Sequence, residues 1–285
     1  MGTDLGRVLH AAYKEMYQTY AWLLVGSFVF IVAFLLLAII PSQSQAVIDM
    51  HALEISVETW QIFAVLGILV FGISLIMRWI KMSMAIDAIM SILIFLGVWF
   101  GLWLIAPMEI ALLISATLTV IQARWRIVIV HDVFTLIGIA GLALYMALAL
   151  STTAILCFLV AFGFYDMFGK RYRGEITKFA MRYTHRGMVP GIIVPKKADQ
   201  WQKKFDSVWE SIGLRFVPVL DIMLPSALIA QAMFLNGYFG CIVAAGICIG
   251  AWIAGKRGER HERSIIIPTM IGGLIPYLLI ISFVS

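Results

Sequence analysis

Long uncharged apolar stretches recur along this chain and restrict its fold more than any other feature. The hydrocarbon core of a bilayer is about 30 Å thick and needs about 20 apolar residues per helix. Only 13% of the 285 residues are charged and 62% are hydrophobic, whereas a soluble domain has roughly 25% charged residues. We therefore predict an all-α, polytopic membrane protein. Its nine transmembrane helices are predicted at residues 20–41, 60–79, 83–106, 108–123, 126–148, 150–168, 214–235, 237–254 and 264–284.

The basic residues fall on one side of the membrane when these nine helices are threaded with the amino terminus in the cytosol. The 21 Lys and Arg residues are Arg7 and Lys14, Arg78 and Lys81, Arg124 and Arg126, those between Lys170 and Arg215, and Lys256, Arg257, Arg260 and Arg263. The opposite loops hold none, and loop 42–59 carries only acids. An excess of Lys and Arg in cytosolic loops is the usual topology signal. It predicts a cytosolic amino terminus and a carboxyl terminus on the opposite side, in a cell membrane.

The net charge of +5 is explained by this topology and by attraction to anionic lipid. We therefore expect the lipid bilayer as a partner and no nucleic acid. The three cysteines have no metal-ligand spacing, so we expect no metal and no organic cofactor.

The predicted helices divide into six, a polar stretch and three more. Residues 1–169 form a six-helix bundle, 170–213 a basic cytosolic loop, and 214–285 a three-helix segment. The first half of the loop has apolar residues at helical spacing among basic ones, which suits a helix on the membrane surface. Ile192, Ile193 and Val194 lie between Pro190 and Pro195. Because proline disfavours helix in the residue before it, a short extended segment is expected there.

Four carboxylates, Asp87, Asp132, Asp166 and Asp221, lie within predicted helices. Acids inside a bilayer are costly and usually functional. Asp166 is four residues before Lys170, or about 6 Å along a helix, and Asp221 is six residues after Arg215, or about 9 Å. These two acids reach similar depths from antiparallel helices. Two such acids can share a proton, so that one activates water while the other protonates a carbonyl.

Depth alone does not single out this pair. Asp87 is six residues after Lys81, and Asp132 is six residues after Arg126. The alternative is that such acids cap helix ends, bond to neighbouring helices or hydrate a cleft. The doublet of His131 and Asp132 is compatible with a structural hydrogen-bond pair and with a proton relay.

Three motifs resemble those of the presenilin-type intramembrane aspartyl proteases, most closely the archaeal presenilin homologues. FYDMF matches that family's Tyr-Asp motif at Tyr165 and Asp166, and LDIMLPSALI matches the segment of its second catalytic Asp at Asp221. IIPTMIGGLI is similar to its Pro-Ala-Leu region, with Pro268 as the proline. VPKKADQWQKKF also resembles the archaeal counterpart. The resemblance covers most of the chain and is strongest from about residue 125 onward.

The resemblance implies an aspartyl endopeptidase that cuts the transmembrane helices of other proteins, with Asp166 and Asp221 as the catalytic residues. A substrate helix must unwind locally, and its freed backbone groups then need partners. The segment Ile192–Val194 is expected to supply them by pairing as an added strand. The residues that the resemblance assigns to substrate binding are Tyr165, Pro218, Val219, Leu220, Ile192, Ile193, Val194, Pro268, Thr269 and Met270.

Two departures from the family pattern keep other functions open. Pro218, Val219 and Leu220 precede Asp221 where the family has Gly-x-Gly, and Pro268, Thr269 and Met270 replace Pro-Ala-Leu. A catalytically inactive relative that binds membrane proteins is one alternative. A proton- or cation-coupled carrier that uses Asp87, Asp132 and His131 is another. Pro268 either frees backbone beside the active site or simply begins the last helix. The sequence does not indicate an oligomeric state.

Overall fold

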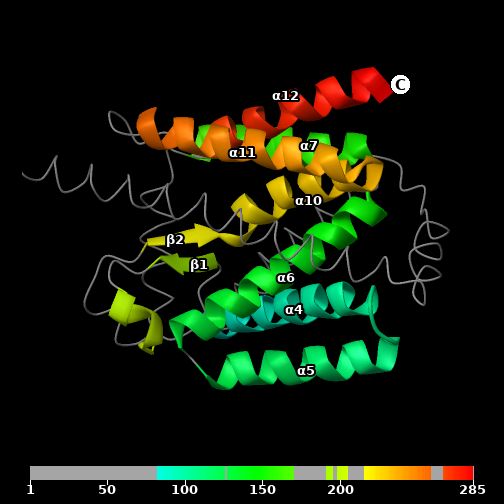
Figure 1. The fold of residues 1–285 in the computed structure, drawn as a ribbon. Coiled ribbons are helices and arrows are strands. Elements are labelled where there is room, and N and C mark those ends of the chain that lie inside the picture. The colour runs from blue at the N-terminus through cyan, green and yellow to red at the C-terminus, as the bar shows by residue number, and fades with distance from the viewer. Residues whose placement is uncertain are drawn as a thin grey trace, which may run out of the picture.

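The computed structural model describes residues 82–125, 127–169, 191–194, 198–204, 215–257 and 266–284 (Figure 1). Its helices are α4 (Met82–Trp103), α5 (Met108–Arg124), α6 (Val128–Ala149), α7 (Thr152–Gly169), α10 (Val219–Leu235), α11 (Gly237–Arg257) and α12 (Ile266–Val284). Two short strands, β1 (Gly191–Val194) and β2 (Arg215–Pro218), and a 3-10 helix, η2 (Ala198–Gln202), lie between α7 and α10. The described part of the chain is therefore mostly helical, as expected.

Seven of the nine predicted apolar helices coincide with described α-helices. The other two, at 20–41 and 60–79, and the expected surface helix after Lys170 lie outside the described residues. By length and composition, one described helix, Val128–Ala149, qualifies as a membrane span. The core helix of a soluble protein passes the same test. The count of nine spans thus stays a prediction.

Local sequence explains where several helices begin. Ser151 precedes α7, and its Oγ accepts a hydrogen bond from the Ala154 N–H at 3.3 Å. Asn236 separates α10 from α11, and its Oδ1 accepts from the Tyr238 N–H at 3.0 Å. Both are N-caps that satisfy amide donors left over in the first helical turn. These caps fix the turns between consecutive antiparallel helices.

Consecutive helices run in alternating directions, which gives the bundle two different ends (Figure 1). We call the end where α6 and α10 begin and where both strands lie the sheet end. The opposite end, where α7 begins and α10 finishes, we call the closed end. The Lys and Arg residues of the described part are Arg124, Lys203, Lys204, Arg215, Lys256 and Arg257, and all belong to segments at the sheet end.

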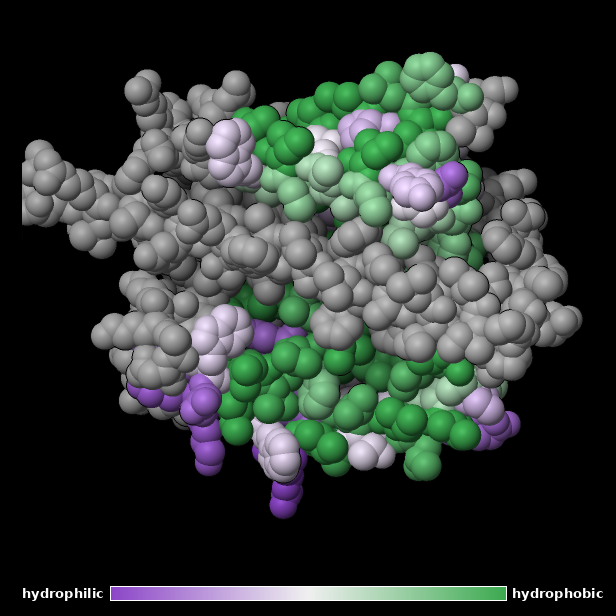
Figure 2. Space-filling model, viewed as in Figure 1, coloured by the Kyte–Doolittle hydropathy of each residue, from purple (hydrophilic) through white to green (hydrophobic). Residues whose placement is uncertain are grey.

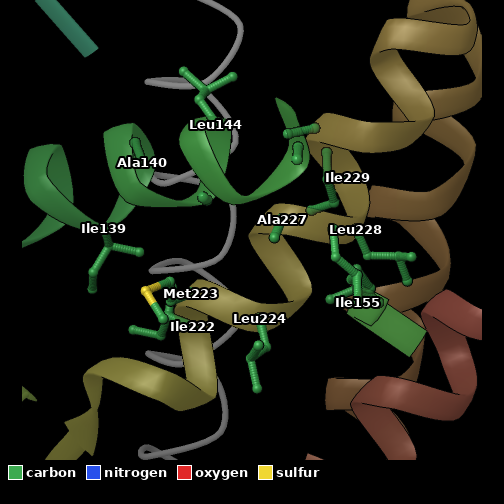
Figure 3. Close-up of a cluster of buried hydrophobic side chains, with 14 of the residues drawn as sticks. Ile139, Ala140, Leu144, Ile155, Ile222, Met223, Leu224, Ala227, Leu228 and Ile229 are labelled. Carbon is green, nitrogen blue, oxygen red and sulfur yellow. The ribbon is translucent and has the colours of Figure 1, made fainter. Parts of the chain in front are cut away.

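Helix α10 is the centre of the packing, since it contacts α6, α7, α11 and α12. Its residues from Ile222 to Ala232 are all buried. Figure 3 shows Ile139, Ala140 and Leu144 of α6 on one side of α10 and Ile155 of α7 beside Leu228. The helix that carries Asp221 in its first turn is thus packed against α6, α7, α11 and α12.

Glycines bring two helix pairs into backbone contact. A Cβ added at Gly246 would overlap the Gly272 carbonyl, and one at Gly250 would overlap the Pro268 carbonyl, both across α11 and α12. Gly97 and Gly138 make a similar approach between α4 and α6. Small residues at helix contacts are typical of membrane helix packing, because close backbones maximise van der Waals contact.

Large apolar side chains remain exposed along the outer helices. In α5 they include Leu113 (68% exposed) and Val120 (66%), and in α12 they include Ile275 and Leu278. Figure 2 shows this apolar surface extending over α5 along the lower edge and over α11 and α12 along the upper edge. Soluble monomers rarely expose contiguous apolar patches of more than a few hundred Å². A surface of this kind typically marks contact with another protein or with a membrane.

Strands β1 and β2 form a two-stranded antiparallel sheet in which Ile192 pairs with Val217 and Val194 with Arg215. The extended segment predicted at Ile192–Val194 is confirmed by β1. The predicted start of the seventh helix at residue 214 is wrong, because Arg215–Pro218 is a strand and the helix begins at Val219. Proline has no N–H to donate and favours extended backbone in the residue before it, so Pro218 delays the helix.

Candidate active site

Asp221 lies in the first turn of α10, immediately after β2. Its side chain is half-buried, while the next residue, Ile222, is fully buried. Leu220 is 40% exposed, so its side chain points away from the core. The bulk of the Leu220 side chain is therefore accommodated outside the helix packing.

Asp166 lies in the last turn of α7, at the same sheet end. The side chains of Tyr165 and Asp166 lie outside the described part, so only the helix positions are considered. Gly163 is three residues earlier and faces α12, since a Cβ placed there would stand 3.4 Å from Met270 Sδ. Position 166 falls on the same face of the helix as Gly163, because residues three apart are neighbours on a helix surface.

Helix α12 contacts both α7 and α10, so positions on those two helices can be compared along its axis. Gly163 of α7 is level with Met270, and Leu228 of α10 is level with Gly273, where an added Cβ would stand 3.3 Å from Leu228 Cδ2. From these contacts Asp166 is about 4.5 Å further toward the sheet end, and Asp221 about 10.5 Å further. Since Met270 and Gly273 are themselves about 4.5 Å apart along α12, both aspartate positions lie about one helix turn nearer the sheet end than Met270.

The His131–Asp132 doublet lies near the start of α6 and binds the backbone of β1. His131 Nε2 is 2.9 Å from the Gly191 carbonyl oxygen, and Asp132 Oδ1 accepts from the Ile193 N–H at 2.9 Å. A carbonyl cannot donate, so Nε2 carries the proton and Nδ1 accepts from Gln122 Nε2 at 3.0 Å. We call Gln122, His131 and Asp132 the strand clamp.

Both edges of β1 are occupied as a result. Alternate residues of a strand direct their backbone groups to opposite edges. Ile192 and Val194 face β2, whereas Gly191 and Ile193 face the strand clamp. In β2 the alternation leaves Phe216 directed away from β1. The backbone N–H and C=O of Phe216 therefore lie on the outer edge of the sheet, five residues before Asp221.

The Pro-Thr-Met segment begins α12. Pro268 is in the first turn, where no helical N–H is required, which fits the interpretation that it starts the helix. Thr269 and Met270 are buried, and Met270 contacts Gly163 of α7. The segment therefore lies beside the helix turn that precedes Asp166.

The sequence motifs did not identify the strand clamp as a unit. Gln122 was not among the candidate residues, and Phe216 was assigned to a helix. The partners of His131 and Asp132 in β1 are 60 and 61 residues away along the chain. The only local signal was a His-Asp doublet near the start of an apolar stretch.

The remaining predicted acid, Asp87, is half-buried in α4, which packs mainly against α5 and α6. Among the residues with described positions, no three or more His, Cys, Asp or Glu side chains are grouped so as to hold a metal. No family model and no curated protein matches this chain.

Proposed function

We propose that this chain is an intramembrane aspartyl endopeptidase in which Asp166 and Asp221 share the acid–base work. The observation that carries the proposal is the common level of the two aspartate positions, contributed by antiparallel helices beside a sheet with an outward edge. The motifs around both residues resemble the presenilin-type proteases. The substrate is the transmembrane helix of another protein.

The membrane setting of this proposal is supported by surface and charge together. Lipid covers the apolar side chains exposed on α5, α11 and α12, and the described Lys and Arg residues meet the cytosol at the sheet end. In the proposed topology nine helices cross a cell membrane, with the amino terminus cytosolic and the carboxyl terminus opposite. The acids then lie close enough to the cytosol for water to reach them.

The proposed chemistry follows from two carboxyls that hold one proton between them, because like charges a few ångströms apart cannot both ionise. The ionised carboxyl takes a proton from water, which attacks the peptide carbonyl carbon. The protonated carboxyl donates its proton to the carbonyl oxygen, which gives a neutral gem-diol. The first carboxyl then passes the proton taken from water to the amide nitrogen, and the C–N bond breaks with the amine as leaving group. The second carboxyl takes a proton back from a diol hydroxyl, so that the products are a carboxylic acid and an amine and the pair again holds one proton. No metal or organic cofactor takes part in this scheme.

The outer edge of β2 is the proposed docking place for the unwound substrate. A substrate strand there gains backbone hydrogen bonds from Phe216, each worth about 0.5–1.5 kcal/mol. It then passes the first turn of α10, where Asp221 lies. In this arrangement Ile192 and Ile193 do not contact the substrate. They are buried in β1 and support β2 from its inner edge.

A carrier that moves protons through His131 and Asp132 is less well supported. Both side chains hold the backbone of β1 in the strand clamp. A relay group needs freedom to exchange its proton with successive partners. These contacts favour a structural role for the doublet over transport.

The test is cleavage of a membrane-anchored reporter by the purified protein in liposomes. Asp166→Asn and Asp221→Asn should each abolish cleavage while the protein still inserts. Retained cleavage in either variant would exclude the proposed pair. Solute uptake that is lost in Asp132→Asn and kept in Asp166→Asn would support the carrier instead.

A further inference from the structure

The strand clamp joins three segments that are distant in the sequence. Gln122 comes from α5, His131 and Asp132 come from α6, and the bound backbone belongs to β1. His131 and Asp132 are 1% and 2% exposed, and Gln122 is 2% exposed. Hydrogen bonds this well buried cannot be replaced by water when they break.

A second tie holds the chain just beyond β1 to the same helix. The Val128 N–H donates to the Lys203 carbonyl at 3.2 Å, and Ile127 pairs with Lys204 in an isolated bridge. Helix η2 also packs against α6. Strand β1 and the Lys203–Lys204 segment are thus each bound to residues at the start of α6, which lies next to them in Figure 1.

The clamp sets the position of β2 through β1. Gly191 and Ile193 bind α6 on one edge, while Ile192 and Val194 pair with β2 on the other. Because Asp221 follows β2 by three residues, a shift of β1 relative to α6 moves the outer edge of β2 relative to the acid. The depth of the sheet in the bundle is therefore determined by α6.

The two carboxylate oxygens of Asp132 differ in their contacts, which allows its charge to be tested separately from its hydrogen bond. Within the described residues Asp132 Oδ2 has no hydrogen-bond partner, and neither does Thr135 Oγ1 one turn further along α6. Only Oδ1 holds the strand. An asparagine keeps that acceptor and places a donor where the unpartnered oxygen stands.

We infer that His131 and Asp132 are positioning residues, which hold the β1–β2 sheet at the height of Asp221 and thereby select the peptide bond that is cut. The inference rests on the proposed protease function for its second half. Its first half, the attachment of β1 to α6 by these side chains, stands on the hydrogen bonds alone. The two halves have separate measurements.

The attachment is tested by hydrogen–deuterium exchange of the protein in lipid nanodiscs. In Asp132→Ala the Ile193 amide should exchange about tenfold faster or more, because a buried donor has lost its acceptor. Asp132→Asn should keep the protection, since the amide oxygen still accepts. Ser115→Ala is the matched control, because Ser115 is equally buried but bonds only to Ala111 of its own helix.

The effect on cleavage is tested with the same variants and a reporter helix. Asp132→Ala should raise KM about tenfold with a smaller change in kcat, and mass spectra of the products should show cuts spread over neighbouring bonds. Asp132→Asn should cut at the parental bond. If Asp132→Ala does not fold, Gln122→Leu, which frees the His131 ring, should give a weaker spread of the same kind.

The outcomes are distinguishable. Unchanged Ile193 exchange in Asp132→Ala overturns the attachment, whatever the activity. Faster exchange with an unchanged product pattern overturns the positioning role. Loss of protection in Asp132→Asn also contradicts the inference, because it assigns the role to charge. A parent protein that cuts no membrane reporter refutes the protease function, and the selection of a peptide bond falls with it, while the exchange result still decides the attachment.

Discussion

The two ends of the bundle both contain buried polar clusters, but the clusters are built differently. At the closed end Tyr277 OH donates to Gln231 Oε1 at 3.1 Å, and Gln231 Nε2 donates to the Leu150 carbonyl at 3.2 Å. Thr152 Oγ1 lies 3.3 Å from the same tyrosine oxygen and, because that hydroxyl proton is already used, donates to it. These contacts join α7, α10 and α12 into one closed network of helices.

At the sheet end the polar groups hold a strand instead of other helices. His131 and Asp132 of the strand clamp form hydrogen bonds with the backbone of β1. The outward backbone N–H and C=O of Phe216 and the half-buried Asp221 belong to the same end. The closed end fixes helices against one another, whereas the sheet end fixes a strand to a helix. Under the proposed function, this difference divides stability from chemistry along the axis of the bundle.

The largest expected effect is at the sheet end. Asp221→Asn and Asp166→Asn should each lower reporter cleavage about 10³-fold or more, because an amide neither takes nor gives the proton. Glu109→Gln is the control, since Glu109 is exposed in the first turn of α5 at the closed end. Cleavage is compared at equal amounts of inserted protein. An equal loss of cleavage in all three variants would contradict the assignment of the chemistry to the sheet end.

A smaller effect is expected from the edge of β2. Phe216→Pro removes the outward N–H and should raise KM about tenfold, because one substrate hydrogen bond is lost. Proline is tolerated on an edge strand where the N–H faces away from the sheet. Phe216→Leu keeps the N–H and should stay close to the parent. The measurement is the Michaelis constant of each variant with a series of reporters. Equal values for Phe216→Pro and Phe216→Leu would contradict substrate docking at the outer edge of β2.

At the closed end a change should affect stability more than cleavage. Tyr277→Phe leaves Gln231 Oε1 without its donor and should lower the free energy of unfolding by about 1 kcal/mol. Tyr238→Phe is the control, because Tyr238 is 81% exposed. Thermal unfolding in detergent should separate the two variants, while cleavage well below the transition stays near the parental rate. A large loss of cleavage at low temperature would show that the closed end takes part in the chemistry.

The smallest effect is expected from Leu220→Gly. Since Leu220 is exposed in the first turn of α10, its removal leaves no core cavity. Cleavage should change by less than about threefold, as for other substitutions worth a few tenths of a kcal/mol. Activity that appears in Leu220→Gly and is absent from the parent would identify the chain as an inactive relative. Initial rates of cleavage of one reporter by the parent and by Leu220→Gly test this prediction.

Helix positions were predictable from the sequence because apolar stretches and their polar interruptions are local. The stretch predicted at 237–254 became Gly237–Arg257, and the one at 264–284 became Ile266–Val284. The strand at Arg215–Pro218 was missed, because Phe216 and Val217 are as apolar as the helix that follows. Pairing with Gly191–Val194 decided its conformation, and that pairing is not local.

The same limit applies to the site. Equal helix depths made Asp87 and Asp132 look like Asp166 and Asp221, since spacing measures only the height of a residue along its own helix. The contacts separate them. Asp132 is bound to β1, whereas the positions of Asp166 and Asp221 are linked through α12.

The glycine contacts between α11 and α12 have a mechanical consequence. With the Gly246 and Gly250 backbones against the Gly272 and Pro268 carbonyls, neither helix can slide along the other without a collision of main chains. The two helices are therefore expected to move together. Under the proposed function, an opening beside α12 that admits a substrate helix would displace α11 and α12 as one unit, and it would separate Met270 from Gly163 in the same movement.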